Sequence, residues 1–303
     1  MIQQLIAEQQ KGYISDIDDL KLIMCAILNG GHVLLEGPPG LGKTKLAHTI
    51  SETLGGSFNR IQFTPDILPS DVTGIKFYHP GTQQFEIKKG PIFTNILLAD
   101  EINRATPKTQ SSLLEAMQEQ TVTIDDTTFP LPEPFVVLAT QNPMEHAQGT
   151  FLLPQAQMDR FMVRLYFDYP TIDQELKIIS GQYDNHVAQI ISSSDELAQL
   201  KKDKDQVFCH DDIYKYITYI VHHTRTDHEL IQGLSPRAGI HIAEMAKAQA
   251  FINSRNYVIP DDVKFVLPAI ACHRVTFRHT QLAEQDKVNI INRLVGEIDV
   301  PTL

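Results

Sequence analysis

An eight-residue loop near the start of the chain constrains the fold more than any other feature of the sequence. Residues 37–44 match the pattern G-x-x-x-x-G-K-[ST] at every defined position. An apolar run at 33–35 precedes them, and a helical pattern over 43–54 follows them. Because the motif has meaning only between a strand and a helix, this context argues against a chance glycine-rich turn. The predicted phosphate loop consists of Gly37, Pro38, Pro39, Gly40, Leu41, Gly42, Lys43 and Thr44.

The residue types of this loop suit a polyphosphate ligand with a divalent cation. Glycines let the backbone curl so that successive N–H groups face the phosphates, and the following helix N-terminus adds positive potential. Lys43 can neutralise the outer phosphates, and the Thr44 hydroxyl can ligate Mg²⁺. We therefore expect a nucleotide and Mg²⁺ as ligands.

Two acids follow a second apolar run, at 96–99. In nucleotide hydrolases the first acid at such a strand end, here Asp100, holds Mg²⁺ together with the loop hydroxyl of Thr44. The second acid, Glu101, is placed to take a proton from the attacking water. Strand-end carboxylates can also simply cap a helix, but the phosphate loop upstream favours the functional interpretation. A glutamate base indicates an ATPase, because GTPase-like switches usually position water with glutamine.

The order of apolar segments predicts the fold class. Buried strands are expected at 33–35, 96–99 and 135–139, with helices over 43–54 and 108–119, so we expect a parallel sheet sandwiched by helices. After Tyr169-Pro170 the pattern changes to helices only. These helices are expected at 172–183, 211–222, 236–254, 260–274 and 281–294, with 201–205 as a solvated loop. The predicted domains are an α/β domain over 1–169 and an all-α domain over 170–303.

Composition narrows the classes of partner and compartment. The formal net charge is −11, which argues against a surface that neutralises nucleic-acid phosphates. No basic and apolar leader opens the chain, and no apolar run is long enough to span a membrane. Three widely separated cysteines form neither a disulfide framework nor a zinc spacing. These features predict a cytoplasmic protein that does not insert into membranes.

Histidines crowd the region 210–228, but their spacing is not that of a metal site. Neither H-E-x-x-H nor a Cys/His ligand pattern is present. We expect these histidines to be solvated or to serve in packing.

The chain resembles the MoxR family of AAA+ ATPases over nearly its whole length. The most specific segments are FTPDILPSDVTG at 63–74, GPIF at 90–93, LADEINRA at 98–105, LLEAMQE at 113–119, ATQNP at 139–143, QMDRF at 157–161, LSPRA at 234–238 and PDDV at 260–263. The resemblance implies a P-loop AAA+ sheet domain followed by a helical lid, and a ring-forming enzyme that hydrolyses ATP between subunits.

The resemblance also assigns roles to single residues. Asn142 matches the sensor-1 residue that holds the attacking water or the γ-phosphate, and Arg160 matches the arginine finger that reaches a neighbour's γ-phosphate. A guanidinium suits the charge that develops on transferred phosphoryl oxygens. Arg237 matches the sensor-2 arginine that couples the lid to nucleotide state. Whether Arg104 contacts a neighbouring site is left open, and the segment around Tyr13 and Ile14 is expected to form a wall for the adenine.

Two further segments match structural features of the same AAA+ branch. Residues 64–93 resemble its helix-2 insertion, and 121–131 resemble its pre-sensor-1 hairpin; both are candidates for contacting a client protein, although the hairpin could be purely structural. The family implies an ATP-promoted homo-oligomer, expected to be a hexameric ring. It also implies chaperone-like remodelling of protein complexes, or maturation of metalloenzymes, with a von Willebrand factor A domain protein as partner.

Two alternative functions remain open. Helicase relatives share the hairpin and the insertion, so a nucleic-acid translocase is one alternative, although 121–134 contains no lysine or arginine. The other is a nucleotide-dependent binding switch with slow turnover. The presence of Glu101, Asn142 and Arg160 favours true hydrolysis over the switch.

Overall fold

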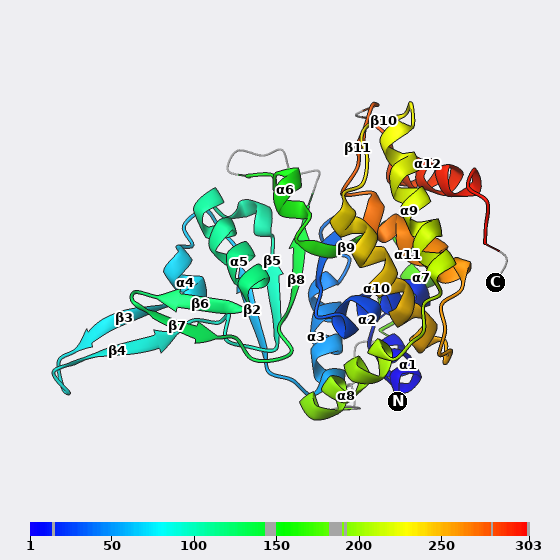
Figure 1. The fold of residues 1–303 in the computed structure, drawn as a ribbon. Coiled ribbons are helices and arrows are strands. Elements are labelled where there is room, and N and C mark those ends of the chain that lie inside the picture. Colours follow the sequence, from blue (N-terminus) through cyan, green and yellow to red (C-terminus); the bar gives the residue numbers. More distant parts are fainter. Residues whose placement is uncertain (14–15, 143–149, 182–189, 191–192, 280, 302–303) are drawn as a thin grey trace.

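The computed structural model describes residues 1–13, 16–142, 150–181, 190, 193–279 and 281–301. Five parallel strands form its central sheet, in the order β2-β5-β8-β1-β9 (Figure 1). They are β2 (Phe58–Gln62), β5 (Ile96–Asp100), β8 (Val136–Gln141), β1 (His32–Glu36) and β9 (Phe161–Tyr166). The three central strands are buried along their whole length, as the continuous apolar runs predict.

Helices cover both faces of the sheet, which confirms the predicted sandwich. On one face, Val33 and Leu35 of β1 belong to a hydrophobic core shared with α1 (Ile2–Gly12), α2 (Ile17–Leu28) and α3 (Lys43–Leu54). On the other face, Leu34 belongs to a second core with α4 (Pro69–Thr73) and α5 (Pro107–Glu119). Adjacent residues of β1 thus point into opposite cores, as the two-residue period of a strand requires.

The second half of the chain forms the helical domain, which also confirms the predicted class. Its helices are α7 (Ile172–Ile179), α8 (Ser194–Asp205), α9 (Asp211–Thr226), α10 (Pro236–Ile252), α11 (Pro260–Ala271) and α12 (Glu284–Gly296). The prediction of helices only was wrong in one detail, because β10 (Leu230–Gln232) and β11 (Thr276–Phe277) form a small antiparallel sheet. Leu230 and Phe277 are buried there, so pairing these two loops covers apolar side chains.

The solvated loop predicted at 201–205 is instead the end of α8, and Lys204 within it is 2% exposed. Its Nζ donates to Asn29 Oδ1 at 2.8 Å and to Glu244 Oε2 at 3.0 Å. Both partners lie far away in the sequence, on the segment after α2 and on α10. A run of alternating charges therefore hides one lysine that is paired inside the protein, as a buried charge must be.

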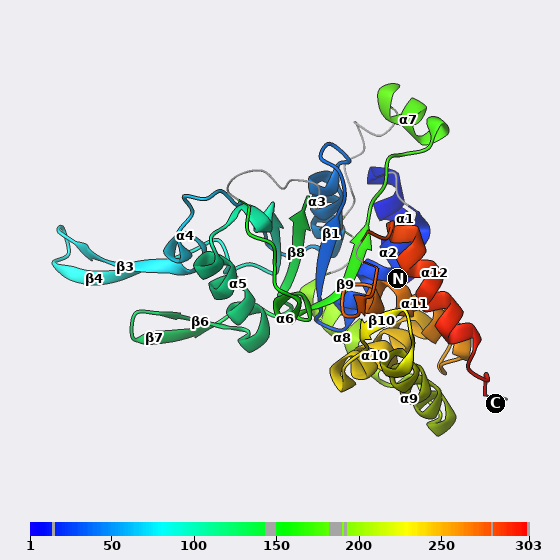
Figure 2. The same ribbon diagram turned by 90° about the horizontal axis from the view of Figure 1, so that it is seen from above.

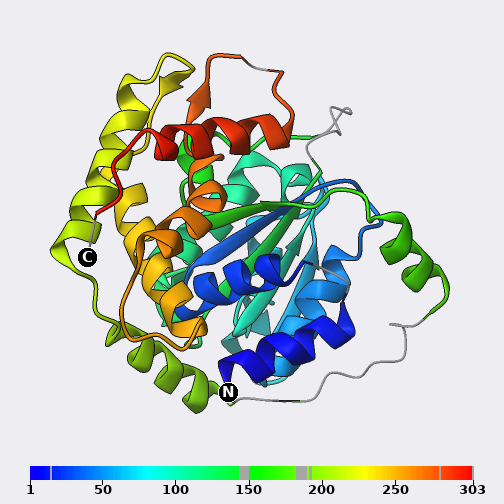
Figure 3. The same ribbon diagram turned by 90° about the vertical axis from the view of Figure 1, so that its right-hand side faces the viewer.

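Helix α7 stands apart from the other helices (Figures 2 and 3). None of its residues is buried, and Ile172, Leu176 and Ile179 are all well exposed. It ends at Ile179, earlier than the sequence predicts, and residue 183 lies outside the described residues. Among the described residues, no helix combines the length and the apolar character that crossing a membrane requires.

Two β-hairpins extend from the sheet domain on the side away from the helical domain (Figure 1). Strands β3 (Gly74–His79) and β4 (Gln84–Lys89) lie within the predicted insertion, and β6 (Thr121–Ile124) and β7 (Thr127–Pro130) form the predicted second hairpin. Lys76 Nζ joins them, at 2.8 Å from Asp125 Oδ2 and 3.2 Å from Asp126 Oδ1.

Candidate functional site

The predicted phosphate loop and both predicted acids lie at the carboxyl edge of the sheet. Glu36, the last residue of β1, pairs with Gln141 of β8 and with Tyr166 of β9. On the next strand, Ala99 pairs with Ala139. The residues that follow these pairs, including Gly37, Asp100 and Asn142, therefore emerge side by side. The carboxyl ends of strands are where open α/β sheets bind their ligands.

The loop has the backbone that its glycines make possible. Gly37, Gly40 and Gly42 all have positive φ, at 141°, 83° and 75°. At Gly37 a Cβ would lie 2.3 Å from the carbonyl oxygen of Phe167, so only glycine fits between β1 and the chain beyond β9. Lys43 begins α3, and its Nζ donates to the Gly37 carbonyl at 2.6 Å, across the mouth of the loop. The loop thus places a helix N-terminus and an ammonium group beside one another, as an anion site requires.

Asp100 is the most heavily bonded side chain of the site. Its Oδ1 accepts the Thr140 hydroxyl at 2.5 Å. Its Oδ2 accepts the Thr44 hydroxyl at 3.2 Å and Arg60 Nη2 at 2.7 Å. The Thr44 hydroxyl and the Asp100 carboxylate are the hard oxygen donors that Mg²⁺ prefers, and this ion usually takes one or two protein oxygens together with substrate phosphates. The pair therefore fits a magnesium site beside the phosphate loop.

Glu101 turns away from β5 with a left-handed backbone, at φ 58°. Its amide donates to the Thr140 hydroxyl at 2.9 Å, so Thr140 holds both acids. Its carboxylate pairs with Arg104 of the short helix η1 (Ile102–Arg104), with Nη1 and Oε2 2.8 Å apart. A non-glycine residue in this conformation costs about 1–3 kcal/mol and persists where the surroundings fix it. This conformation was not predictable from the strand pattern.

Asn142 follows β8 directly and is buried. The side chain of Asn103 lies close to it, with Nδ2 3.4 Å from the Asn142 carbonyl oxygen. Gln141, the residue before Asn142, donates its side-chain Nε2 to Glu36 Oε1 at 2.7 Å. Arg164 Nη1 lies 2.9 Å from the other oxygen of Glu36, Oε2. These buried contacts fix the ends of β8 and β1 relative to one another, which holds Asn142 next to the start of the phosphate loop.

A cavity of about 550 Å³ opens beside the phosphate loop. Tyr13, residues 39–42, residues 166–170 and one side of α7 line it, and its volume is typical of small-molecule sites. The Tyr13 hydroxyl donates to the Leu41 carbonyl at 2.6 Å. Burial and the charge of Asp19 raise the pKa of Tyr13 to about 12, so its phenol stays neutral. Tyr13 thus lines this cavity, and Ile14 lies outside the described residues.

Arg160 and Arg237 lie at the opposite edge of the sheet. Arg160 precedes Phe161, which pairs with His32 at the start of β1. This edge and the phosphate loop lie at opposite ends of β1, which has five residues. At about 3.3 Å per residue the strand spans about 17 Å, which is farther than an arginine side chain extends. Arg237 Nη1 lies 3.9 Å from Asp159 Oδ2, so it shares this edge with Arg160. The fold brings the two arginines together and keeps them away from Lys43 of the same chain.

A buried arginine anchors that edge. Arg274 Nε donates to Asp159 Oδ1 at 2.7 Å, and its other nitrogens donate to the carbonyls of Phe161, Met162 and Ile270. Burial lowers the pKa of Arg274 to about 10, against the opposing effect of Asp159. Arg274 Nη2 also lies 2.8 Å from His241 Nδ1. Neither Arg274 nor Arg60 was predicted, because each acquires its role through a partner distant in the sequence.

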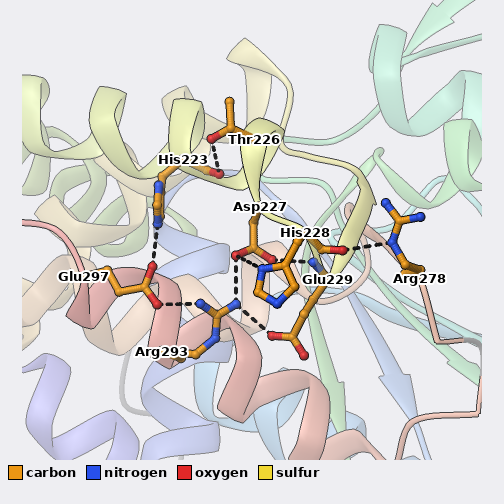
Figure 4. Close-up of polar contacts among 8 residues, drawn as sticks. All are labelled: His223, Thr226, Asp227, His228, Glu229, Arg278, Arg293 and Glu297. Carbon is orange, nitrogen blue, oxygen red and sulfur yellow. Dashed lines mark hydrogen bonds and ion pairs between the residues drawn. The ribbon is translucent and has the colours of Figure 1, made fainter.

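The histidines of this region are solvated at 210, 222 and 228, whereas His223 is half-buried and takes part in a group of surface ion pairs (Figure 4). His223 Nε2 lies 2.9 Å from Glu297 Oε2, and Arg293 joins α12 to Asp227 and Glu229. Among the residues that the structure describes, no group of three or more His, Cys, Asp or Glu side chains could hold a metal ion. The ion pairs instead tie α12 to the end of α9.

Comparison with known proteins gives the same picture from independent sources. Residues 32–163 match the family described as "ATPase family associated with various cellular activities (AAA)", and residues 222–294 match the AAA lid domain. Chaperone MoxR1 of Mycobacterium tuberculosis is 39% identical, over 99% of this chain and 82% of its own length. The uncharacterized protein YeaC of Bacillus subtilis is 42% identical, over 92% of this chain and 88% of its own.

A solved structure agrees with the fold described above. The crystal structure of a candidate ATPase from Cytophaga hutchinsonii superposes with a TM-score of 0.89 at 38% identity, covering 99% of this chain and 95% of that one. The MoxR proteins of Methylorubrum extorquens and Paracoccus denitrificans are more distant, at 24% and 28% identity. On these matches, together with the phosphate loop and the lid, the chain belongs to the MoxR family of AAA+ ATPases.

Proposed function

We propose that this protein hydrolyses ATP to ADP and phosphate. The observation that carries the proposal is the contact between Thr44 and Asp100, which brings the phosphate loop and the acidic strand end within 3.2 Å of each other. In this proposal the loop binds the triphosphate and the cavity beside it takes the base. Thr44 and Asp100 would hold Mg²⁺, which when bound neutralises charge on the phosphates.

Glu101 is the proposed general base, and Asn142 the residue that orients the attacking water. Glu101 comes directly after Asp100, and its amide is fixed by Thr140, so its carboxylate is held at the same edge as the phosphate loop. The Arg104 guanidinium contacts that carboxylate at 2.8 Å, and Glu101 must leave this partner to accept a proton. Proton transfer by a positioned carboxylate contributes about 10²–10⁴-fold to rate.

Arg160 and Arg237 are proposed to complete the site of a neighbouring subunit. They lie one strand length from the phosphate loop of their own chain, so neither reaches the nucleotide bound there. Arg160 Nε is buried and finds no acceptor among the described residues. A ring built from head-to-tail contacts would bring this edge of one subunit to the phosphate loop of the next. We propose an ATP-promoted homo-oligomer, hexameric by analogy with the family.

The biological role that we propose follows from the family. A relative over almost the whole chain is named a chaperone, which supports ATP-driven remodelling of protein complexes or metalloenzyme maturation. The two hairpins, β3–β4 and β6–β7, are the proposed contacts with a client, and a von Willebrand factor A domain protein is the proposed partner. We place the protein in the cytoplasm.

The proposal is tested by phosphate release from ATP and Mg²⁺ by the wild type, Lys43→Ala and Glu101→Gln. We expect turnover in the wild type only, with nucleotide binding retained in Glu101→Gln and weakened in Lys43→Ala. Lys215→Ala is the control, because it removes an exposed ammonium from α9, far from the motif and the cavity. A wild type that binds ATP but releases no phosphate, alone or with a partner, would contradict the proposal.

A slow binding switch is the second candidate, because Arg104 holds the carboxylate of the proposed base. Arg104→Ala separates the two functions. If the pair limits turnover, the substitution raises the rate of phosphate release. If turnover falls, Arg104 takes part in hydrolysis, and the switch loses its structural support. Phosphate release with and without single-stranded DNA tests the nucleic-acid alternative, and we expect no stimulation.

A further inference from the structure

Arg60 makes a contact with the candidate magnesium site that the proposed reaction does not use. It lies on the edge strand β2, opposite Leu98 of β5, with its side chain 46% exposed. Its Nη2 is 2.7 Å from Asp100 Oδ2 and 2.7 Å from Gln62 Oε1. The backbone continues the connection, since the Phe63 amide donates to the Asp100 carbonyl at 2.8 Å. The end of β2 therefore holds Asp100 by both side chain and backbone.

The contact is made on the oxygen that also faces the phosphate loop. Asp100 Oδ2 accepts Arg60 and Thr44, whereas Oδ1 accepts Thr140 at 2.5 Å. Asp100 is only 8% exposed, so water screens these interactions poorly. A guanidinium already neutralises part of the negative charge that would attract a divalent cation to this place.

Two roles for Arg60 predict opposite effects. If the guanidinium chiefly orients the Asp100 carboxylate, its removal misplaces that carboxylate and weakens binding of the metal. If it acts chiefly as a competing positive charge, its removal leaves the full carboxylate charge for the metal and strengthens binding. Thr140 already orients one oxygen of Asp100 and Thr44 the other, so Arg60 is not needed to orient this carboxylate. The geometry favours the second role.

We propose that Arg60 competes with Mg²⁺ for the charge of Asp100 and thereby sets the Mg²⁺ concentration that the site requires. The proposal rests on the proposed function, because it assumes that nucleotide and Mg²⁺ bind at this edge. Arg60 tunes the site and is not a catalytic residue, since it touches a metal-holding side chain and not the substrate. The effect is electrostatic, so it depends on the charge of residue 60 more than on its shape.

The test is binding of the non-hydrolysable analogue AMP-PNP by calorimetry, over a series of free Mg²⁺ concentrations. The quantity compared is the Mg²⁺ concentration at which the affinity gain is half complete. In Arg60→Gln we expect it to fall about fivefold, the scale of a half-exposed ion pair. Arg60→Met must shift in the same direction, and Arg60→Lys should stay within about twofold of the wild type because it keeps the charge.

Arg104→Gln is the matched control, because it removes the same charge from the neighbouring acid, Glu101. We expect a smaller shift there than in Arg60→Gln. An unchanged or higher Mg²⁺ requirement in both Arg60→Gln and Arg60→Met overturns the inference and leaves the proposed function standing. Failure of the folded wild type to bind AMP-PNP at any Mg²⁺ concentration overturns the proposed function and the inference with it.

Discussion

The two edges of the central sheet differ in what they present. The carboxyl edge carries the phosphate loop, the acids Asp100 and Glu101, and the cavity beside Tyr13. The opposite edge carries Arg160 and Arg237. The first edge thus carries the groups proposed to bind a nucleotide and to activate water, but the arginines proposed to stabilise the transferred phosphate lie a whole strand away from it.

The two edges also differ in how they are held. Asp100 is buried and is fixed by two hydroxyls and by Arg60, whose side chain is half-exposed. Asp159, by contrast, is held by Arg274, whose side chain is 2% exposed and bonded to three backbone carbonyls of β9 and α11. The carboxyl edge leaves space for a ligand, whereas buried ion pairs and hydrogen bonds anchor the opposite edge, which carries Arg160 and Arg237. This difference suits the proposed enzyme, in which a neighbouring subunit completes the site.

The largest effect is expected from Glu101→Gln at the carboxyl edge. It removes the proposed base while keeping the side-chain volume, so phosphate release should fall about 10³–10⁴-fold. AMP-PNP affinity should stay close to that of the wild type, because the loop and Asp100 are untouched. Single-turnover phosphate release with binding measured in parallel checks this. A variant that retains full turnover would remove Glu101 from the mechanism.

Arg160→Ala addresses the opposite edge, where we expect a loss of similar or somewhat smaller size. Arginines that contact the transferred phosphate contribute about 10³–10⁵-fold to the rate, and we expect a loss at the lower limit of this range. Nucleotide binding by the separate subunit should persist. Arg164→Ala is not a suitable control because Arg164 is buried, so Lys215→Ala on the exposed face of α9 serves instead. Loss of nucleotide binding in the monomeric variant would contradict the separation of the two edges.

Asp159→Asn tests the ion pair between Asp159 and Arg274 that anchors the opposite edge. The substitution leaves the buried Arg274 charge without its carboxylate, which should lower the free energy of unfolding by about 3 kcal/mol, the lower end for a broken buried pair because Asp159 is partly exposed. Denaturant unfolding measures the change, with Asp173→Asn on the exposed helix α7 as the control that should change nothing. An unfolding free energy equal to that of the wild type would show that the carbonyls alone suffice to hold Arg274.

The smallest effect concerns His32, the first residue of β1, which lies on the same edge as Phe161. Burial lowers its pKa to about 4, and its ring bonds the Met117 carbonyl and the Val137 amide at 3.0 Å each. The unfolded chain binds a proton near pH 6.5 and the folded chain does not, so stability is complete above that pH and falls toward pH 4. This histidine should cost about 1.3 kcal/mol between pH 7.5 and pH 5.5.

His32→Gln isolates that contribution, because glutamine does not titrate. Urea unfolding of both proteins at pH 7.5 and pH 5.5 gives the difference. Equal pH dependence in the two proteins would mean that His32 is not held neutral in the folded state.

Local spacing made much of this molecule predictable. The phosphate loop, its helix over 43–54 and the acids at 100–101 are encoded within short stretches, and the alternating buried strands gave the fold class. What the sequence could not supply were pairings between distant residues. Arg60 meets Asp100, Arg274 meets Asp159 and Lys204 meets Glu244 only after folding, so Lys204 was wrongly placed in a solvated loop. The location of Arg237 beside Arg160 depends in the same way on how the lid packs.

The central claim is that Arg160 of one subunit completes the site that holds Glu101 in its neighbour, and mixing two inactive variants tests this claim most directly. Glu101→Gln subunits retain Arg160, and Arg160→Ala subunits retain Glu101, so an interface between the two kinds can contain one complete site. In randomly mixed rings about a quarter of the interfaces would be complete. Phosphate release should therefore reappear on mixing, to about that fraction of the wild-type rate. If the mixture assembles and remains as inactive as its components, Glu101 and Arg160 do not act across a subunit boundary, and the account is wrong.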